Sequence, residues 1–164
     1  MRRALAAVVV LTLIAGAATV MAQTPSKPNF AGKWTLVPDP NAPAPTGRGG
    51  GRGGGLGQAF SAEQNDKTLT VISTGPQGET KAVYNLDGSE SKNPLTFNGN
   101  TIDRVSKTKW DGSKLVITTT SNFNGNPFES TQTWSLDATG NLIVESTSNL
   151  GGNPTTTKTT YKKG

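Results

Sequence analysis

Apolar and polar residues alternate along most of the second half of the chain, in short runs that are separated by turn residues. The clearest case is a unit that occurs twice: a β-branched run, a Gly/Asn turn with a proline, and a second Thr-rich run. The two copies cover 114–134 and 141–161, at a constant offset of 27 residues. Period-two runs on either side of a tight turn are typical of antiparallel hairpins. The second half is therefore predicted to be an antiparallel meander.

Strand-like runs recur through the rest of the chain at hairpin spacing. They cover 29–37, 67–73, 80–86, 102–109, 114–121, 128–136, 142–148 and 156–161, with a weaker run at 95–97. Turn dipeptides such as Asp87-Gly88, Asp111-Gly112 and Asn124-Gly125 fall between these runs, and nothing reads as a long helix. The pattern predicts an all-β domain, either an up-and-down antiparallel barrel of about eight strands or a β-sandwich.

The residues that share one face of each predicted strand change from large and apolar to small and polar along its length. Leu115 and Ile117 are followed on the same face by Thr119, and Trp134 is preceded by Gln132. A sandwich core is more often apolar throughout, whereas a barrel can hold water or a ligand against a half-polar wall. This pattern favours a barrel whose interior holds water or a ligand.

Arg104 is the only arginine outside the first 22 residues and the Gly-rich segment 47–55. If Arg104 points outward, Val105 turns inward together with Lys107 and Lys109, and two charged groups lose hydration. We therefore expect Arg104 to point into the barrel, where its guanidinium is the best candidate contact for an anionic or carbonyl-bearing ligand. The alternative is that Arg104 caps the barrel or pairs with a nearby acid.

The first 22 residues have the organisation of a secretory signal peptide. Arg2 and Arg3 precede an apolar, Ala-rich run over 4–20, and Val20-Met21-Ala22 has the small-x-small form of a cleavage site. The expected mature chain, 23–164, forms a single domain that is secreted or periplasmic. No second apolar run follows, so no membrane span is expected after cleavage.

Charge and composition exclude several functions for the mature chain. Removal of Arg2 and Arg3 lowers the basic count from 16 to 14 against 11 acidic residues, and a net charge of +3 is too small to argue for nucleic acid. The chain has no Cys and no His, which excludes most metal sites and nearly all nucleophile-base pairs. We therefore expect that the protein is not an enzyme, that it has no catalytic residue, and that it binds neither a metal nor a cofactor. A domain of this length forms its own core, and we expect a monomer.

Residues 38–57 interrupt the strand pattern. They are almost all Pro, Gly, Ala and Asn, with Arg48 and Arg52 in the Gly-rich part. Such a segment cannot bury enough apolar surface to offset the entropy that it loses on ordering, so a flexible loop is predicted. Gly/Arg-rich tracts bind RNA in other proteins, but two arginines on an exported chain favour a solvated loop.

The first strand and the last hairpins resemble those of calycin barrels. Phe30-Ala31-Gly32-Lys33-Trp34 resembles the F-x-G-x-W opening strand of lipocalins and fatty-acid-binding proteins, and the hairpins ending in Thr160-Tyr161 look like the end of such a barrel. The stretches 84–90, 109–115 and 133–136 resemble lipocalin-like proteins exported by soil bacteria. The resemblance implies a lipocalin-like fold, and Thr159 stands where fatty-acid-binding proteins have the arginine of an R-x-Y pair.

Five side chains are candidate ligand contacts in this interpretation. They are Arg104, Trp134, Tyr161, Tyr84 and Gln132. Trp134 and Tyr161 occupy equivalent positions in the two repeats and can equally stack in the core. The leading hypothesis is a barrel that binds a small apolar or amphipathic molecule. The competing hypothesis is a structural or interaction protein of the cell envelope whose barrel is filled by side chains.

Overall fold

A computed structural model describes residues 26–39, 56–75, 78–97, 99–123, 125–149 and 154–164 of the chain. Within these ranges the chain forms eleven strands and no helix. The strands are β1 (Gly32–Leu36), β2 (Ala59–Gln64), β3 (Thr68–Gly75), β4 (Gly78–Asn85), β5 (Ser91–Lys92), β6 (Leu95–Phe97), β7 (Asn100–Asp111), β8 (Lys114–Phe123), β9 (Asn126–Leu136), β10 (Leu142–Ser148) and β11 (Thr155–Lys163). The expected signal peptide and most of the expected loop lie outside the described residues.

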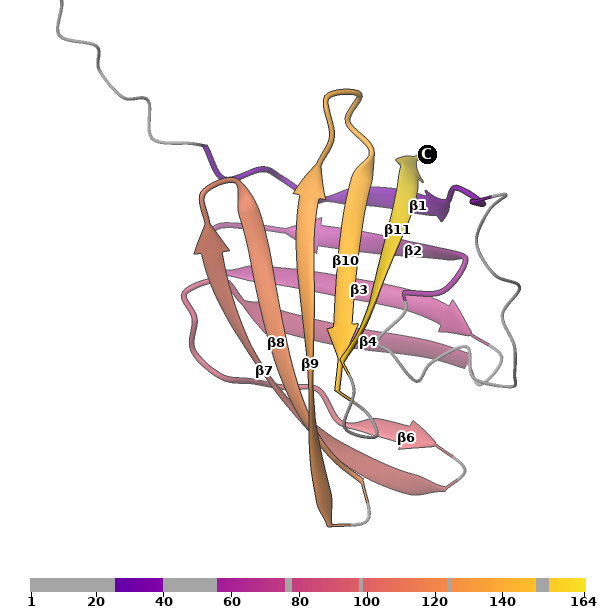
Figure 1. Cartoon of the computed structure of the whole chain (residues 1–164), viewed down its shortest axis with the longest axis vertical. Helices are drawn as coiled ribbons and strands as arrows, with labels where there is room; N and C mark the ends of the chain where they lie inside the picture. Colours follow the sequence, from indigo (N-terminus) through magenta and orange to yellow (C-terminus); the bar gives the residue numbers. More distant parts are fainter. Residues whose placement is uncertain (1–25, 40–55, 76–77, 98, 124, 150–153) are drawn as a thin grey trace, which may run out of the picture.

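The strands form one antiparallel sheet that curves into a nearly closed barrel (Figure 1). The strand order is β4-β3-β2-β1-β11-β10-β9-β8-β7-β5, and β6 pairs with the first residues of β7. β1 pairs with β11 on one side and β2 on the other, and so joins the two ends of the chain. The up-and-down antiparallel barrel predicted from the sequence is confirmed, although it has eleven strands in the described ranges instead of about eight.

Two of these strands are missing from the sequence-based prediction. β2 reads AFSAEQ, in which alanine, glutamate and glutamine have low β propensity. It forms because β1 and β3 pair with both of its edges. β5 has two residues, which is too short to show a period, and is placed only by its pairing with β7. Tertiary pairing determines both strands.

The apolar core fills one end of the barrel. We call it the closed end, and it carries the turns 65–67, 86–90, 111–113 and 137–141. The largest fully buried apolar side chains are Phe30, Trp34, Leu69, Leu115, Ile117, Trp134 and Leu142. Leu56 is also buried, and the carbonyl of Gly57 accepts a hydrogen bond from the Tyr161 hydroxyl at 3.2 Å. The packed barrel therefore includes the residues just before β2.

Phe30 covers the closed end although it lies before the first strand. Its ring stacks on Trp110 at a centroid distance of 6.2 Å and meets Trp134 edge to face at 5.7 Å. The Phe30 N–H donates to Gln64 Oε1 at 2.8 Å, and the Phe30 carbonyl accepts from Trp34 Nε1 at 2.8 Å. These contacts hold the segment before β1 across the barrel, as the course of the chain in Figure 1 shows.

Gly32 occupies a position that only glycine fits well. Its φ angle is 145°, which side-chain-bearing residues rarely adopt. A Cβ atom at this position would lie 2.5 Å from Lys163 Cε, and the Lys163 Nζ lies 5.6 Å from the centre of the Trp34 ring. The positive φ is what requires the glycine of the opening F-x-G-x-W pattern, because the Lys163 side chain is flexible and could move.

The turn 137–141 is organised by the carboxylate of Asp137. Hydrogen bonds from Thr139 and Asn141, led by the Thr139 hydroxyl, lower the pKa of Asp137 from 3.8 to about 2. Because the folded pKa lies below the unfolded one, the carboxylate stabilises the fold above about pH 4, and this contribution is lost as the pH falls towards 2.

Asp137→Asn is therefore expected to lower the melting temperature at pH 7 and to flatten its dependence on pH between about 4 and 2. Melting curves of both proteins over a pH series measure this difference. An unchanged pH dependence in the variant would mean that the turn does not depend on the charged carboxylate.

Candidate functional site

The inner wall of the barrel changes from apolar to polar away from the closed end, in rows that are set by strand register. The apolar row, which lies next to Leu136 and Leu142 at the closed end, contains Trp110, Leu115, Trp134 and Val144. The next row contains Thr108, Ile117, Gln132 and Ser146, and the third contains Ser106, Thr119, Ser130 and Ser148. The last row contains Arg104, Ser121 and Phe128. The half-polar faces expected from the sequence therefore share one interior.

The inner wall is accessible at the end opposite the closed end, which we call the open end. Thr80 of β4 shares a face with the buried Tyr84, yet Thr80 is exposed. Thr155 and Thr157 of β11 share a face with the buried Tyr161 and are exposed as well. Inward-facing side chains are exposed only where solvent reaches the interior, so the open end presents an accessible, hydroxyl-rich wall.

Arg104 lies on this wall, half-buried on the inner face of β7. Ser106 and Thr108 on the same face are buried, whereas Lys107 and Lys109 on the other face are exposed. The observed alternation agrees with the register that the sequence favours. Its physical cause is that both lysines keep their hydration while the small polar side chains turn inward.

β4 and β7 meet without a ladder of backbone hydrogen bonds, and side chains close this seam of the barrel. The Asn93 amide accepts from the Val83 N–H at 2.8 Å and donates to the Val83 carbonyl at 2.9 Å, as a neighbouring strand would. Ser91 Oγ accepts from the Asn85 N–H at 2.8 Å, and the Thr108 hydroxyl donates to the Asn85 carbonyl. Three side chains thus replace a missing stretch of ladder.

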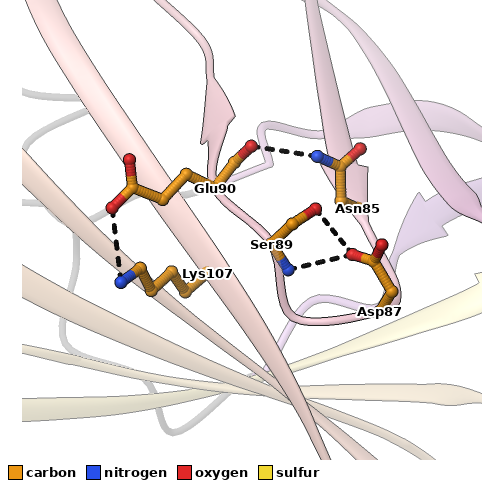
Figure 2. A network of polar contacts seen from close by, with 5 residues as sticks. All are labelled: Asn85, Asp87, Ser89, Glu90 and Lys107. Atoms are coloured by element: carbon orange, nitrogen blue, oxygen red, sulfur yellow. Dashed lines mark hydrogen bonds and ion pairs between the residues drawn. The ribbon is translucent and has the colours of Figure 1, made fainter.

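A second set of contacts holds the turn between β4 and β5 on the outside of the barrel (Figure 2). The Asp87 carboxylate accepts from the N–H of Ser89 at 2.9 Å and from its hydroxyl at 2.6 Å. The Glu90 carbonyl accepts from the Asn85 side chain at 2.9 Å, and the Glu90 carboxylate lies 3.3 Å from Lys107 Nζ. The ion pair is exposed and contributes little stability, but the turn as a whole brings the following residues to the seam.

Tyr84 and Arg104 approach each other across this seam. Tyr84 is buried, and burial raises its pKa above the ordinary value for tyrosine, while the positive charge of Arg104 lowers it in part. Asn93 joins the two strands here, because its backbone N–H donates to the Arg104 carbonyl while its side chain bonds to Val83, the residue before Tyr84. Tyr84 stays neutral at physiological pH, so its O–H remains a hydrogen-bond donor.

Two of the remaining candidates lie in the core. Trp134 is fully buried, and its Nε1 donates to Gln132 Oε1 at 3.1 Å. The ring of Tyr161 meets Phe60 edge to face at 5.0 Å. Gln132 lies between the apolar row and the hydroxyl rows. The structure therefore places Arg104 on the inner wall, with Tyr84 buried on the facing strand. Trp134 and Tyr161 lie nearer the closed end.

Sequence reasoning did not find the residues that close the seam. Asn93 precedes Pro94, a dipeptide that reads as a turn, and nothing in its neighbourhood indicates that its amide pairs with β4. The buried hydroxyl pair of Ser106 and Thr119, at 2.8 Å, was also not singled out. The half-polar alternation of the strands was the one signal that could have found this pair.

Comparison with protein-family models gives no match, and none of the curated proteins matches the chain. The described ranges contain no helix that is long and apolar enough to cross a membrane. In the same ranges, no three His, Cys, Asp or Glu side chains come together as a group that could hold a metal ion. A functional assignment therefore depends on the geometry of the barrel.

Proposed function

We propose that this chain is a lipocalin-like barrel that binds a small, partly apolar or amphipathic molecule at its open end. The observation that carries the proposal is the change of the inner wall from fully buried apolar side chains at the closed end to small polar side chains around the half-buried Arg104, with exposed hydroxyl groups at Thr80, Thr155 and Thr157 at the open end. An apolar floor with a few placed polar groups is the usual composition of a small-molecule site. Because side chains fill the closed end, a ligand would occupy only the part of the barrel between Trp134 and the open end.

Arg104 would bind the polar end of such a ligand. Its guanidinium is charged at all physiological pH values and pairs bidentately with planar anions such as carboxylates. Tyr84 would add a neutral O–H donor from the opposite side of the seam. The hydroxyl groups of the third row, among them Ser130 and Ser148, would contact the remaining polar atoms or bound water.

The expected signal peptide supports a site of action outside the cytoplasm, either secreted or periplasmic. A carrier in such a compartment needs neither a cofactor nor a catalytic residue. Its expected partner is the small molecule itself, with no nucleic acid involved.

A structural or interaction protein of the cell envelope is the second candidate function. The observation in its favour is the complete filling of the closed end, where Phe30, Leu115 and Trp134 have no exposed surface. In this case the hydroxyl wall holds only water, and the barrel serves as a stable support for its outer surface.

Arg104→Met is expected to weaken the binding of an amphipathic anion by about tenfold or more, because a charge-assisted hydrogen bond is lost from a partly desolvated site. A fluorescence titration with 8-anilinonaphthalene-1-sulfonate measures the dissociation constant. Lys109→Met is the matched control, since it removes the same charge from the exposed face of the same strand. We expect this control to stay within about twofold of the unmodified protein.

The two variants also distinguish a site from a general charge effect. If both weaken binding equally, the probe responds to net charge and Arg104 is no ligand contact. If the unmodified protein does not bind the probe, or Arg104→Met binds it unchanged, the proposed anion contact is wrong.

A further inference from the structure

The edge of β4 carries backbone groups that no described part of the chain pairs. The Leu86 N–H donates to the Lys67 carbonyl, so in this register the backbone N–H and carbonyl groups of the even-numbered β4 residues bond to β3. The backbone N–H and carbonyl groups of the odd-numbered residues point away from β3. Those from Val83 onward are bonded by the side chains of the seam, whereas Glu79 and Lys81 are exposed and have no backbone partner among the described residues.

β4 also lacks the features that protect the other edges of the sheet. β5 has two residues, and β6 has three and follows Pro94, which has no N–H. Very short edge strands and prolines are common ways to prevent edge-to-edge pairing. β4 has eight residues, and none of them is a proline.

The charges along this edge fit a second copy of the same strand. When two copies of β4 pair antiparallel about Thr80, Glu79 lies opposite the partner's Lys81, and Lys81 lies opposite the partner's Glu79. Sliding the strands by two residues in either direction places Glu79 opposite the partner's Glu79, or Lys81 opposite the partner's Lys81. Unlike charges therefore select the register that is centred on Thr80.

We propose that two copies of this chain associate edge to edge through β4 in a twofold-symmetric antiparallel pair. Glu79 and Lys81 of each copy supply the outward N–H and carbonyl groups, so each of the two facing pairs forms two backbone hydrogen bonds. The two Glu-Lys pairs lie on the outer face of the joined sheet. Pairing stops at Val83, because the Asn93 amide already occupies its backbone groups.

This association is independent of the proposed ligand and is weak. Five residues from each copy form an interface well below the size of stable complexes, so the dimer dissociates on dilution. The monomer that the sequence predicts is then the form that exists at low concentration.

Amide hydrogen exchange at micromolar and millimolar protein concentration tests the proposal residue by residue. The amides of Glu79 and Lys81 are expected to exchange more slowly at the higher concentration, while those of Thr80 and Ala82, which already bond to β3, stay unchanged. Protection of Glu79 and Lys81 that is equal at both concentrations would mean that a segment of the same chain covers the edge. Rapid exchange at both concentrations would overturn the proposal.

Charge variants test the register by sedimentation equilibrium. Lys81→Glu places like charges in both facing pairs and is expected to weaken the dimer about tenfold. The double variant Glu79→Lys/Lys81→Glu restores unlike pairs and is expected to recover the affinity. Lys81→Pro removes the outward N–H but no bond to β3, so it is expected to abolish the dimer at an unchanged melting temperature. A double variant as weak as Lys81→Glu would contradict this register.

Discussion

Phe30→Ala is expected to lower the free energy of unfolding by about 3–5 kcal/mol, the usual loss when a fully buried aromatic side chain is truncated. Phe30 has no exposed surface and packs between Trp110 and Trp134, so its removal leaves a cavity at the closed end of the barrel. Urea unfolding followed by tryptophan fluorescence measures the loss, and the denaturant slope shows whether unfolding stays two-state.

The size of this loss decides whether the segment before β1 is part of the barrel. Phe30→Leu keeps most of the buried volume and is expected to cost less than half as much. Lys33→Ala changes an exposed side chain nearby and is expected to cost less than about 0.5 kcal/mol. If Phe30→Ala costs no more than this control, the segment does not close the barrel.

Asn93→Leu is expected to lower the free energy of unfolding by about 2–3 kcal/mol, because it leaves the Val83 N–H and carbonyl without their partners at the seam. The Val83 amide is expected to exchange faster as well. Asn85→Ala is the control: it removes an exposed side-chain bond to Glu90 at the same seam and is expected to cost less than about 1 kcal/mol.

Asn93→Asp separates the two halves of the Asn93 contact. The carboxylate can still accept from the Val83 N–H, but it repels the Val83 carbonyl in place of donating to it. It should therefore be at least as destabilising as Asn93→Leu at neutral pH and should recover stability when the carboxylate is protonated. An Asn93→Asp protein as stable as the unmodified one would show that side chains do not close the seam.

Much of the sheet could be predicted because its hairpins are local in sequence. The alternation of apolar and polar residues from Leu142 to Ser148, with turn residues on both sides, predicts a strand with the same bounds as β10. The same local alternation indicates which way Arg104 points, since the neighbouring Lys107 and Lys109 avoid the interior. In these cases the nearest neighbours along the chain carry the information.

The rest depends on contacts between distant segments. β2 has a weak strand pattern and forms because both neighbouring strands pair with it. Tyr84 and Arg104 lie on strands near opposite ends of the sheet order, and only closure of the barrel brings them together. Asn93 closes the seam with a side chain that reads as a turn residue. No period along the chain encodes these contacts.

Native mass spectrometry of the mature protein, isolated from the organism that makes it, tests the central claim most directly. We expect an added mass on the folded protein that disappears on denaturation, and a smaller loaded fraction for Arg104→Met than for Lys109→Met. The mass of the polypeptide alone, for both the unmodified protein and these variants, would contradict ligand binding and leave the side-chain-filled structural barrel as the function of this fold.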